Sequence, residues 1–201
     1  MPKHIALLSA AAFGALALSF SAAPSLAQDK MMMKNEMKNE KTVNVGGAPM
    51  YPSKNIVQNA VNSKDHTTLV AAVKAAGLVP TLEGAGPFTV FAPTNAAFSK
   101  LPAGTVDTLL KPENKAKLTG VLTYHVVAGR MTAANLMKAV KDGGGQAMLK
   151  TVEGEQLTVK QPSAGKLTIT DAKGGVSTVT IPDVLQSNGV IHVVDTVLLP
   201  S

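Results

Sequence analysis

The sequence predicts an α+β domain in which helices come first and strands follow. From residue 54 to residue 140, apolar residues recur at helical spacing in several segments. After the glycines at 143–145, the pattern changes to short β-branched runs separated by Gly, Pro, Asn or Asp, which predicts strands joined by hairpins. One run within the helical part, "GPFTVFAP" at 86–93, also predicts a strand. Because this early strand must join the later ones, we expect a single domain.

The first 27 residues have the pattern of a secretory signal peptide. Lys3 and His4 give a basic start, residues 5–22 are apolar, and "SLA-Q" offers the small residues of a cleavage site. The apolar run is Ala-rich and too weak for a membrane anchor, which needs roughly 20 strongly apolar residues. The chain has no Cys, including the one that bacterial lipid attachment requires. We expect export to the periplasm, the cell surface or the medium, without a transmembrane anchor.

Residues 28–52 differ in composition from everything that follows. "MKNE" occurs twice in tandem, and no apolar face is expected from the pattern, so we predict a disordered tether. Four methionines lie close together here: Met31, Met32, Met33 and Met37. Their thioethers are soft ligands suited to Cu(I), which gives an alternative function, a periplasmic protein that handles copper or another small ligand. His and Cys are absent from the segment, and this favours a plain spacer.

Residues 53–201 are expected to form the globular domain. Helices are predicted in "NIVQNAVN" (55–62) and "TTLVAAVKAAGL" (67–78), the second capped by Thr67 or Thr68 and ended by Gly77 with Pro80. After the early strand, Thr94 or Asn95 should cap a brief helix. Three more helices are predicted in "TVDTLLK", "ENKAKLTGVLTYH" and "TAANLMKAV". The later strands are predicted in "MLKTV", "QLTVKQ", "KLTIT", "VSTVTIPDVL" and "GVIHVVDTVLL".

The residue patterns favour neither catalysis nor nucleic-acid binding. The sequence contains no nucleophile elbow, no P-loop, no cysteine nucleophile and no tight cluster of zinc ligands. A triad of His125, Asp195 and a serine can be imagined, but three such residues occur in almost any chain. The net charge of +6 comes from lysines spread along the whole sequence, whereas nucleic-acid binding requires a basic stripe with aromatics. We therefore expect neither an enzyme nor a cofactor.

The pair Tyr124–His125 stands between two aliphatic runs. His125 falls in phase with Leu118, Val121 and Leu122 on a helix, so we expect it on the buried face, with a polar partner nearby. Tyr124 points to one side of that face and is expected to be accessible. The residues expected to form a structural polar core are Thr94, Asn95, His125, His192 and Asp195, with His192 at the rim of the sheet.

Three long segments carry a family resemblance. "GPFTVFAPTNAAFSKLP" (86–102), "LTYHVVAG" (122–129) and "NGVIHVVDTVLLP" (188–200) resemble the signature segments of the fasciclin (FAS1) domain, in the family's order and spacing. The helix at 68–82 resembles the one that precedes the first segment. The resemblance covers about 150 residues and is closest to bacterial secreted members with one domain.

The resemblance implies a wedge of two β-sheets packed at an angle, with several helices covering one side. It also implies a secreted or periplasmic adhesion module that binds a protein or polysaccharide. We expect a monomer or weak homo-oligomer. In animal matrix members, the Tyr-His segment and a Pro-Asp-Ile loop are implicated in integrin binding. The matching positions here are Tyr124, Pro182, Asp183 and Val184, with Val184 in place of the isoleucine.

Overall fold

The computed structural model describes residues 41–201. The helices are α2 (Ile56–Ala60), α3 (Thr67–Ala76), α4 (Val79–Glu83), α5 (Asn95–Ser99), α6 (Thr105–Leu110), α7 (Lys115–Tyr124) and α8 (Ala133–Asp142), with 3-10 turns η1 (Lys64–His66) and η2 (Pro112–Asn114). The strands are β1 (Val43–Val45), β2 (Ala48–Met50), β3 (Phe88–Pro93), β4 (Val126–Ala128), β5 (Gln146–Lys150), β6 (Gln156–Ser163), β7 (Lys166–Thr170), β8 (Val176–Gln186) and β9 (Gly189–Val194). The predicted α+β class is confirmed.

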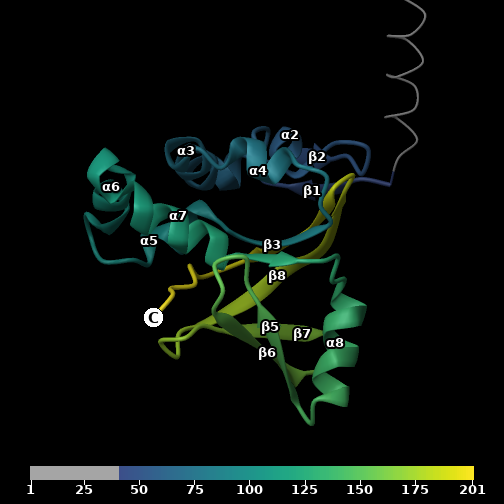
Figure 1. Ribbon diagram of the computed structural model, residues 1–201. Coiled ribbons are helices and arrows are strands. Elements are labelled where there is room, and N and C mark those ends of the chain that lie inside the picture. Colours follow the sequence, from purple (N-terminus) through teal and green to yellow (C-terminus); the bar gives the residue numbers. More distant parts are fainter. Residues whose placement is uncertain (1–40) are drawn as a thin grey trace, which may run out of the picture. The chain divides into compact units, whose positions relative to one another are not determined.

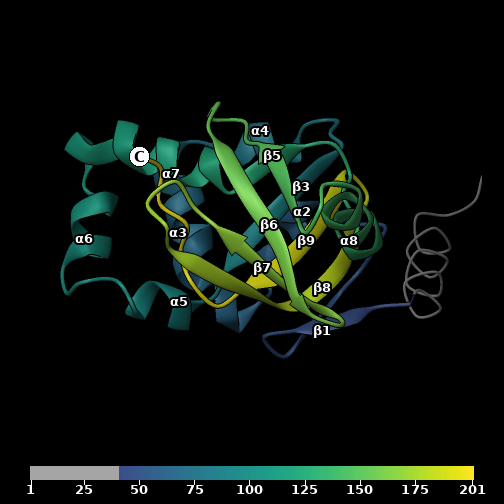
Figure 2. The same cartoon turned by 90° about the horizontal axis from the view of Figure 1, so that it is seen from below.

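Seven strands form one sheet in the order β4-β3-β9-β8-β7-β6-β5. The early strand β3 pairs in parallel with the last strand, β9, and this pairing joins the helical part to the strand-rich part. The long strand β8 belongs to both halves of the sheet, and its pairing with β9 shifts register on either side of Ile181. Such bulges bend and twist a strand. The two halves therefore meet at an angle, as Figure 2 shows, and give the wedge.

The two ends of the sheet come together. Val127 of β4 forms an isolated bridge with Thr151, which follows β5. The edge strands β4 and β5 are thereby drawn toward each other, so the strands approach a closed barrel. A closed arrangement leaves few unpaired backbone groups on sheet edges, where other chains could add a strand.

Helices cover the two halves of the sheet unequally. Helices α2 to α7 gather beside the half made by β3, β4 and β9, whereas α8 lies apart against β5 and β6 (Figure 1). Two apolar cores result. The helix-side core includes Ile56, Leu69, Val90, Leu122, Val184 and Ile191, and the strand-side core includes Phe91, Tyr124, Leu136, Leu157, Ile169 and Leu198.

The helix ends follow the sequence signals with one exception. Thr94 caps α5 by accepting from the Ala97 amide at 3.2 Å, and Gly77 ends α3 with a φ of 74°. The predicted cap of α3 by Thr67 or Thr68 is wrong. The cap comes from a different helix, because the Asn95 amide oxygen accepts from the Thr68 backbone N–H at 3.0 Å.

The predicted tether is wrong for its last part, because residues 43–50 form a β-hairpin. Strands β1 and β2 pair around a turn in which Gly46 and Gly47 have positive φ. Val45, Ala48 and Met50 point into the helix-side core, where Val45 and Met50 are each 3% exposed. Alternating apolar residues around a Gly-Gly turn are a hairpin signal, but here the signal is short and follows directly on a polar segment. The globular unit therefore begins before residue 53.

Several expectations concern residues 1–40, which lie outside the described residues. These are the signal peptide at 1–27, the first part of the tether, and the copper hypothesis on Met31, Met32, Met33 and Met37. Within residues 41–201, none of the helices combines the length and the apolar character needed to span a bilayer.

Candidate functional site

Tyr124 is fully buried, which contradicts the expectation that a partner can touch it. Its side chain is 0% exposed and belongs to the strand-side core. The hydroxyl donates to the Gln156 carbonyl at 3.2 Å and accepts from the Ala172 amide at 2.9 Å, and burial raises the pKa of Tyr124. The physical reason is that the end of α7 is covered on two sides. Its leucines face the helix-side core, while the neighbouring side of the helix faces the second core.

His125 lies in the interior, 2% exposed, at the junction of α7 and β4. Its Nε2 accepts from the Leu198 amide at 2.9 Å, so the hydrogen is on Nδ1, which donates to the Val121 carbonyl at 2.7 Å. Burial lowers the pKa of His125 to about 4. The imidazole is therefore neutral and joins the helix to the segment that follows the last strand.

The other residues of the expected polar core lie in separate places. Thr94 and Asn95 are half-buried at the start of α5, and Asp195 is half-buried directly after β9. The Asp195 carboxylate accepts from the Thr178 amide at 2.8 Å, and its Oδ2 lies 3.7 Å from the Lys100 Nζ. The imagined triad does not form, since both ring nitrogens of His125 bond to the backbone. Within residues 41–201, no group of three His, Cys, Asp or Glu side chains could hold a metal.

Residues 181–183 form a fixed bulge in β8. Pro182 has no backbone N–H to give to the ladder, so it is expected at such an irregularity. Asp183 has a φ of 54°, the one left-handed position among the described residues other than glycines. Pro182 is exposed, but Val184 is 1% exposed and faces the helix-side core. The expectation that Val184 contacts a partner is therefore wrong, because strand alternation turns it inward.

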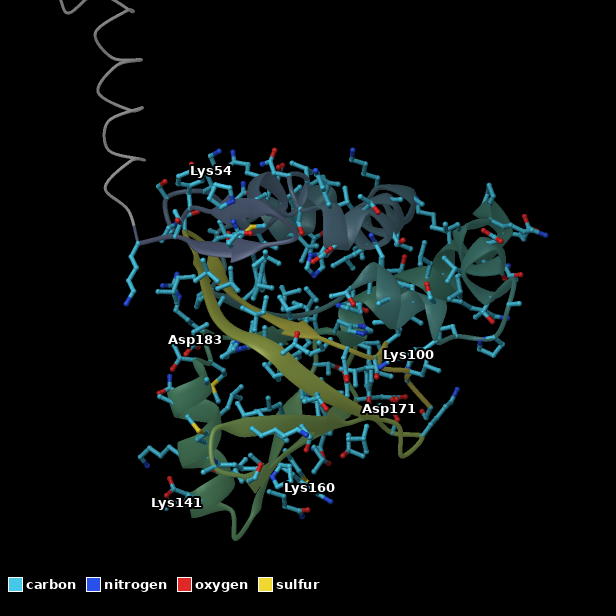
Figure 3. The ribbon with its side chains drawn as sticks, turned by 180° about the vertical axis from the view of Figure 1, so that it is seen from behind. Lys54, Lys100, Lys141, Lys160, Asp171 and Asp183 are labelled. Atoms are coloured by element: carbon cyan, nitrogen blue, oxygen red, sulfur yellow. The ribbon has the colours of Figure 1, made fainter. Side chains whose placement is uncertain are left out.

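Asp183 ties the bulge to two other parts of the fold. Its carboxylate accepts a hydrogen bond of 2.7 Å from the backbone amide of Ala133, the first residue of α8. Figure 3 shows Asp183 beside that helix. A carboxylate is favourable there because a helix N-terminus carries partial positive charge. The Asp183 amide donates to His192 Nδ1 at 3.3 Å, and His192 Nε2 donates to the Met131 carbonyl at 2.8 Å. His192 is 0% exposed and lies inside the sheet, not at its rim.

Arg130 completes this part of the surface. Its Nη2 donates to the carbonyls of Gln186 and Ser187, at 3.0 and 3.2 Å, and so holds the end of β8 against the segment before α8. Arg130 is the only arginine in the chain, which was a signal that sequence reasoning missed. Leu185 was also missed, and it is 40% exposed although both of its neighbours in the strand are buried.

We call these four residues the bulge surface: Arg130, Pro182, Asp183 and Leu185. Three hydrogen bonds hold this surface: the Arg130 guanidinium donates to the Gln186 carbonyl, the Asp183 carboxylate accepts from the Ala133 amide, and the Asp183 amide donates to His192. The surface presents an exposed ring, an exposed aliphatic side chain and a guanidinium. A rigid surface of this kind loses little conformational entropy on binding. Tyr124 does not belong to it, because its hydroxyl bonds to β6 and to the turn after β7.

The family model of the fasciclin domain matches residues 64–200. The chain belongs to the fasciclin family. Among relatives, it is 48% identical to Protein sll1483 of Synechocystis sp. over 161 residues, which are 80% of this chain and 82% of that protein. It is 42% identical to the cell surface glycolipoprotein MPB83 of Mycobacterium bovis over 126 residues, covering 61% of this chain and 48% of that one.

The fasciclin fold is also shared with a solved structure. A FAS1 domain pair from the insect cell adhesion molecule Fasciclin I has a TM-score of 0.66, with 22% identity, over 74% of this chain and 52% of the other. At this identity the likeness concerns the fold. The FAS1 wedge inferred from the three signature segments is thus confirmed.

Proposed function

We propose that this fasciclin protein acts outside the cytoplasm as a non-catalytic module that attaches the cell to a protein or polysaccharide. The family membership carries the proposal. Support comes from a relative named as a cell surface protein and from a fold neighbour that is a cell adhesion molecule. Export by the N-terminal signal peptide is part of the proposal.

The bulge surface is the proposed contact region. Arginine is enriched at the energetic centres of protein interfaces, and it stacks and forms paired hydrogen bonds with carboxylates. Arg130 uses Nη2 for the carbonyls of Gln186 and Ser187 at the end of β8, and guanidinium has further N–H donors for a partner. Pro182 and Leu185 offer apolar contact on either side of the acidic Asp183. This mixture suits a neutral or weakly acidic partner surface.

Competition for attachment tests the function. Cells of the producing organism lacking this protein should attach less to their natural surface, and expression of the full chain should restore attachment. An excess of the purified full chain should inhibit wild-type cells by occupying the partner. The same chain after thermal unfolding is the control and should not inhibit. Equal attachment by cells with and without the protein would reject adhesion as the function.

The alternative of a copper-handling protein gains no support from the family match. Its methionines lie outside the described residues.

A further inference from the structure

The outer face of strands β5, β6 and β7 is a second surface, separate from the bulge surface. Along β5, β7 and residues 156–160 of β6, buried side chains alternate with more exposed ones, and the buried ones belong to the strand-side core. Helix α8 packs on the core side, because its Leu136 and Val140 belong to the same core. In Figure 2 no helix lies in front of β6. The side chains that point away from the core therefore face solvent.

This outer face carries positive charge without negative charge. Lys150, Lys160 and Lys166 are exposed, one on each strand, and the three strands contain no Asp or Glu. Glu153 and Glu155 lie outside the strands, in the connection between β5 and β6. Within residues 41–201, none of the three lysines takes part in an ion pair. Three ammonium groups on one face attract an anionic partner.

The register of the strands sets the spacing of these charges. Lys160 stands opposite Thr168, so Lys166, two residues earlier on β7, is its diagonal neighbour at about 7–8 Å. Lys150 stands opposite Gln156, which precedes Lys160 by four residues, and this places the two lysines about 14 Å apart. Charges separated by such distances suit an extended chain with repeated anionic groups, not a single small anion.

The face between the lysines is polar and uncharged. Its exposed or half-buried side chains are hydroxyls and amides, namely Gln146, Gln156, Thr158, Thr168 and Thr170. Hydroxyl and amide groups both donate and accept hydrogen bonds, and so do the hydroxyls of a sugar chain. The combination of separated ammonium groups with hydroxyls and amides therefore matches an anionic polysaccharide.

Two other anionic partners fit this face less well. Single-stranded nucleic acid is bound by stacking its bases on aromatic side chains, and β5, β6 and β7 contain no aromatic residue. Binding at a membrane surface requires an apolar face that enters the bilayer. Met148 is the one large apolar side chain exposed on these three strands, which is too little for such a face.

We propose that the outer face of β5, β6 and β7 binds an anionic polysaccharide. The carboxylate or sulfate groups of the polysaccharide pair with Lys150, Lys160 and Lys166, while its hydroxyls bond to the threonines and glutamines between them. The inference goes beyond the proposed attachment function, because it concerns a different surface and is measured without cells. A negative result would leave the proposal for the bulge surface standing.

The direct test titrates the full chain, labelled with nitrogen isotope, with oligosaccharides of alginate, which carry carboxylates, or of dextran sulfate. In NMR spectra the amide signals of β5, β6 and β7 should move with saturable binding to at least one of them, while those of α3 and α7 stay. Raising the NaCl concentration from about 50 mM to about 500 mM should weaken binding, because salt screens exposed charges.

Three further polymers test the chemistry of recognition. Neutral dextran lacks the charge and should not bind, and polyglutamate lacks the sugar hydroxyls and should bind more weakly. Vesicles of anionic phospholipid should also bind more weakly. The proposal is overturned if neither anionic oligosaccharide moves the signals of β5, β6 and β7. Equal or tighter binding of dextran, polyglutamate or the vesicles would overturn it as well.

Two double variants remove the same charge from different faces. Lys150→Gln with Lys160→Gln changes the outer face, whereas Lys111→Gln with Lys117→Gln removes two exposed lysines from the helical half. All four side chains are exposed, so both variants should fold as the wild type does. Isothermal titration with the oligosaccharide that binds should show about tenfold weaker binding for the first variant and unchanged binding for the second. Equal weakening in both, or unchanged binding by the first, would overturn the proposal.

Discussion

Three histidines, His66, His125 and His192, are each at most 3% exposed. Burial lowers the pKa of all three, since it penalises the charged imidazolium. For His192, Nδ1 accepts from the Asp183 amide, so a proton added there would break the bond that holds the bulge. For His125, a proton added at Nε2 would displace the Leu198 amide. The fold therefore requires these imidazole rings to be neutral.

Acidification should destabilise the protein in a defined range. The unfolded chain binds protons at these histidines near pH 6.5, whereas folded His125 does so at about pH 4. The contribution of the neutral histidines to the free energy of unfolding is complete above pH 6.5 and is lost as the pH falls toward 4. At about pH 5 the free energy of unfolding should be lower than at about pH 7.5 by at least about 2 kcal/mol, the share of His125 alone. Urea unfolding measures the free energy at both pH values. Equal free energies would contradict the conclusion that these histidines are neutral in the folded protein.

Tyr124 should behave as a core residue when it is changed. Tyr124→Phe removes the hydroxyl that joins Gln156 and Ala172, and we expect a loss of about 1–2 kcal/mol in the free energy of unfolding. Tyr124→Ala also opens a cavity and should cost about 3–5 kcal/mol. Chemical denaturation measures both changes. A Tyr124→Ala variant with unchanged stability would show that the side chain is accessible after all.

At the scale of elements, Asp183 joins strand β8 to helix α8. Asp183→Asn keeps an oxygen acceptor and a residue that tolerates positive φ, and it should lose about 0.3–1 kcal/mol with the charge at the helix N-terminus. Asp183→Ala loses the acceptor and places an alanine in the left-handed region, for a loss of about 2–3 kcal/mol. Thermal or urea unfolding ranks the two variants by their loss of stability. Alanine as mild as asparagine would refute the capping role.

The helices and strands that could be predicted are those whose positions depend on residues close together in the sequence. Periodicity located the helix ending at Tyr124 and the strands after residue 145, and local caps located Thr94 and Gly77. The cap of α3 was missed because Asn95 supplies it from 27 residues away along the chain. The burial of Tyr124 was missed for a similar reason, since the second core that covers it comes from strands later in the sequence.

The candidate site was predicted only in part. The resemblance led to Pro182, which is exposed, and to Asp183, which is half-buried in the same bulge of β8. It also led to Val184 and Tyr124, which are buried because motif matching carries no information about which way a side chain faces. Arg130 reaches the site through contacts with residues more than 50 positions away, and no local pattern indicates such a contact.

At the scale of the whole molecule, the β1–β2 hairpin should be necessary for full stability. A chain that begins at Lys41 keeps the hairpin, whereas one that begins at Ser53 loses the buried side chains of Val45 and Met50. The loss of their burial should lower the free energy of unfolding by about 3–6 kcal/mol. Urea unfolding of the two chains makes the comparison. Equal stability would mean that the hairpin adds nothing to the core.

The central claim is that the bulge surface is where this fasciclin domain contacts its partner. The most direct measurement compares Leu185→Ser with Val176→Ser, two changes of exposed aliphatic residues on β8, 40% and 55% exposed in the wild type. Each full-length variant is expressed in cells lacking the protein, and attachment is measured after equal display and folding are verified. We predict that Leu185→Ser reduces attachment by about tenfold, while Val176→Ser restores it fully. Full attachment with Leu185→Ser, or equal loss with both variants, would contradict the account.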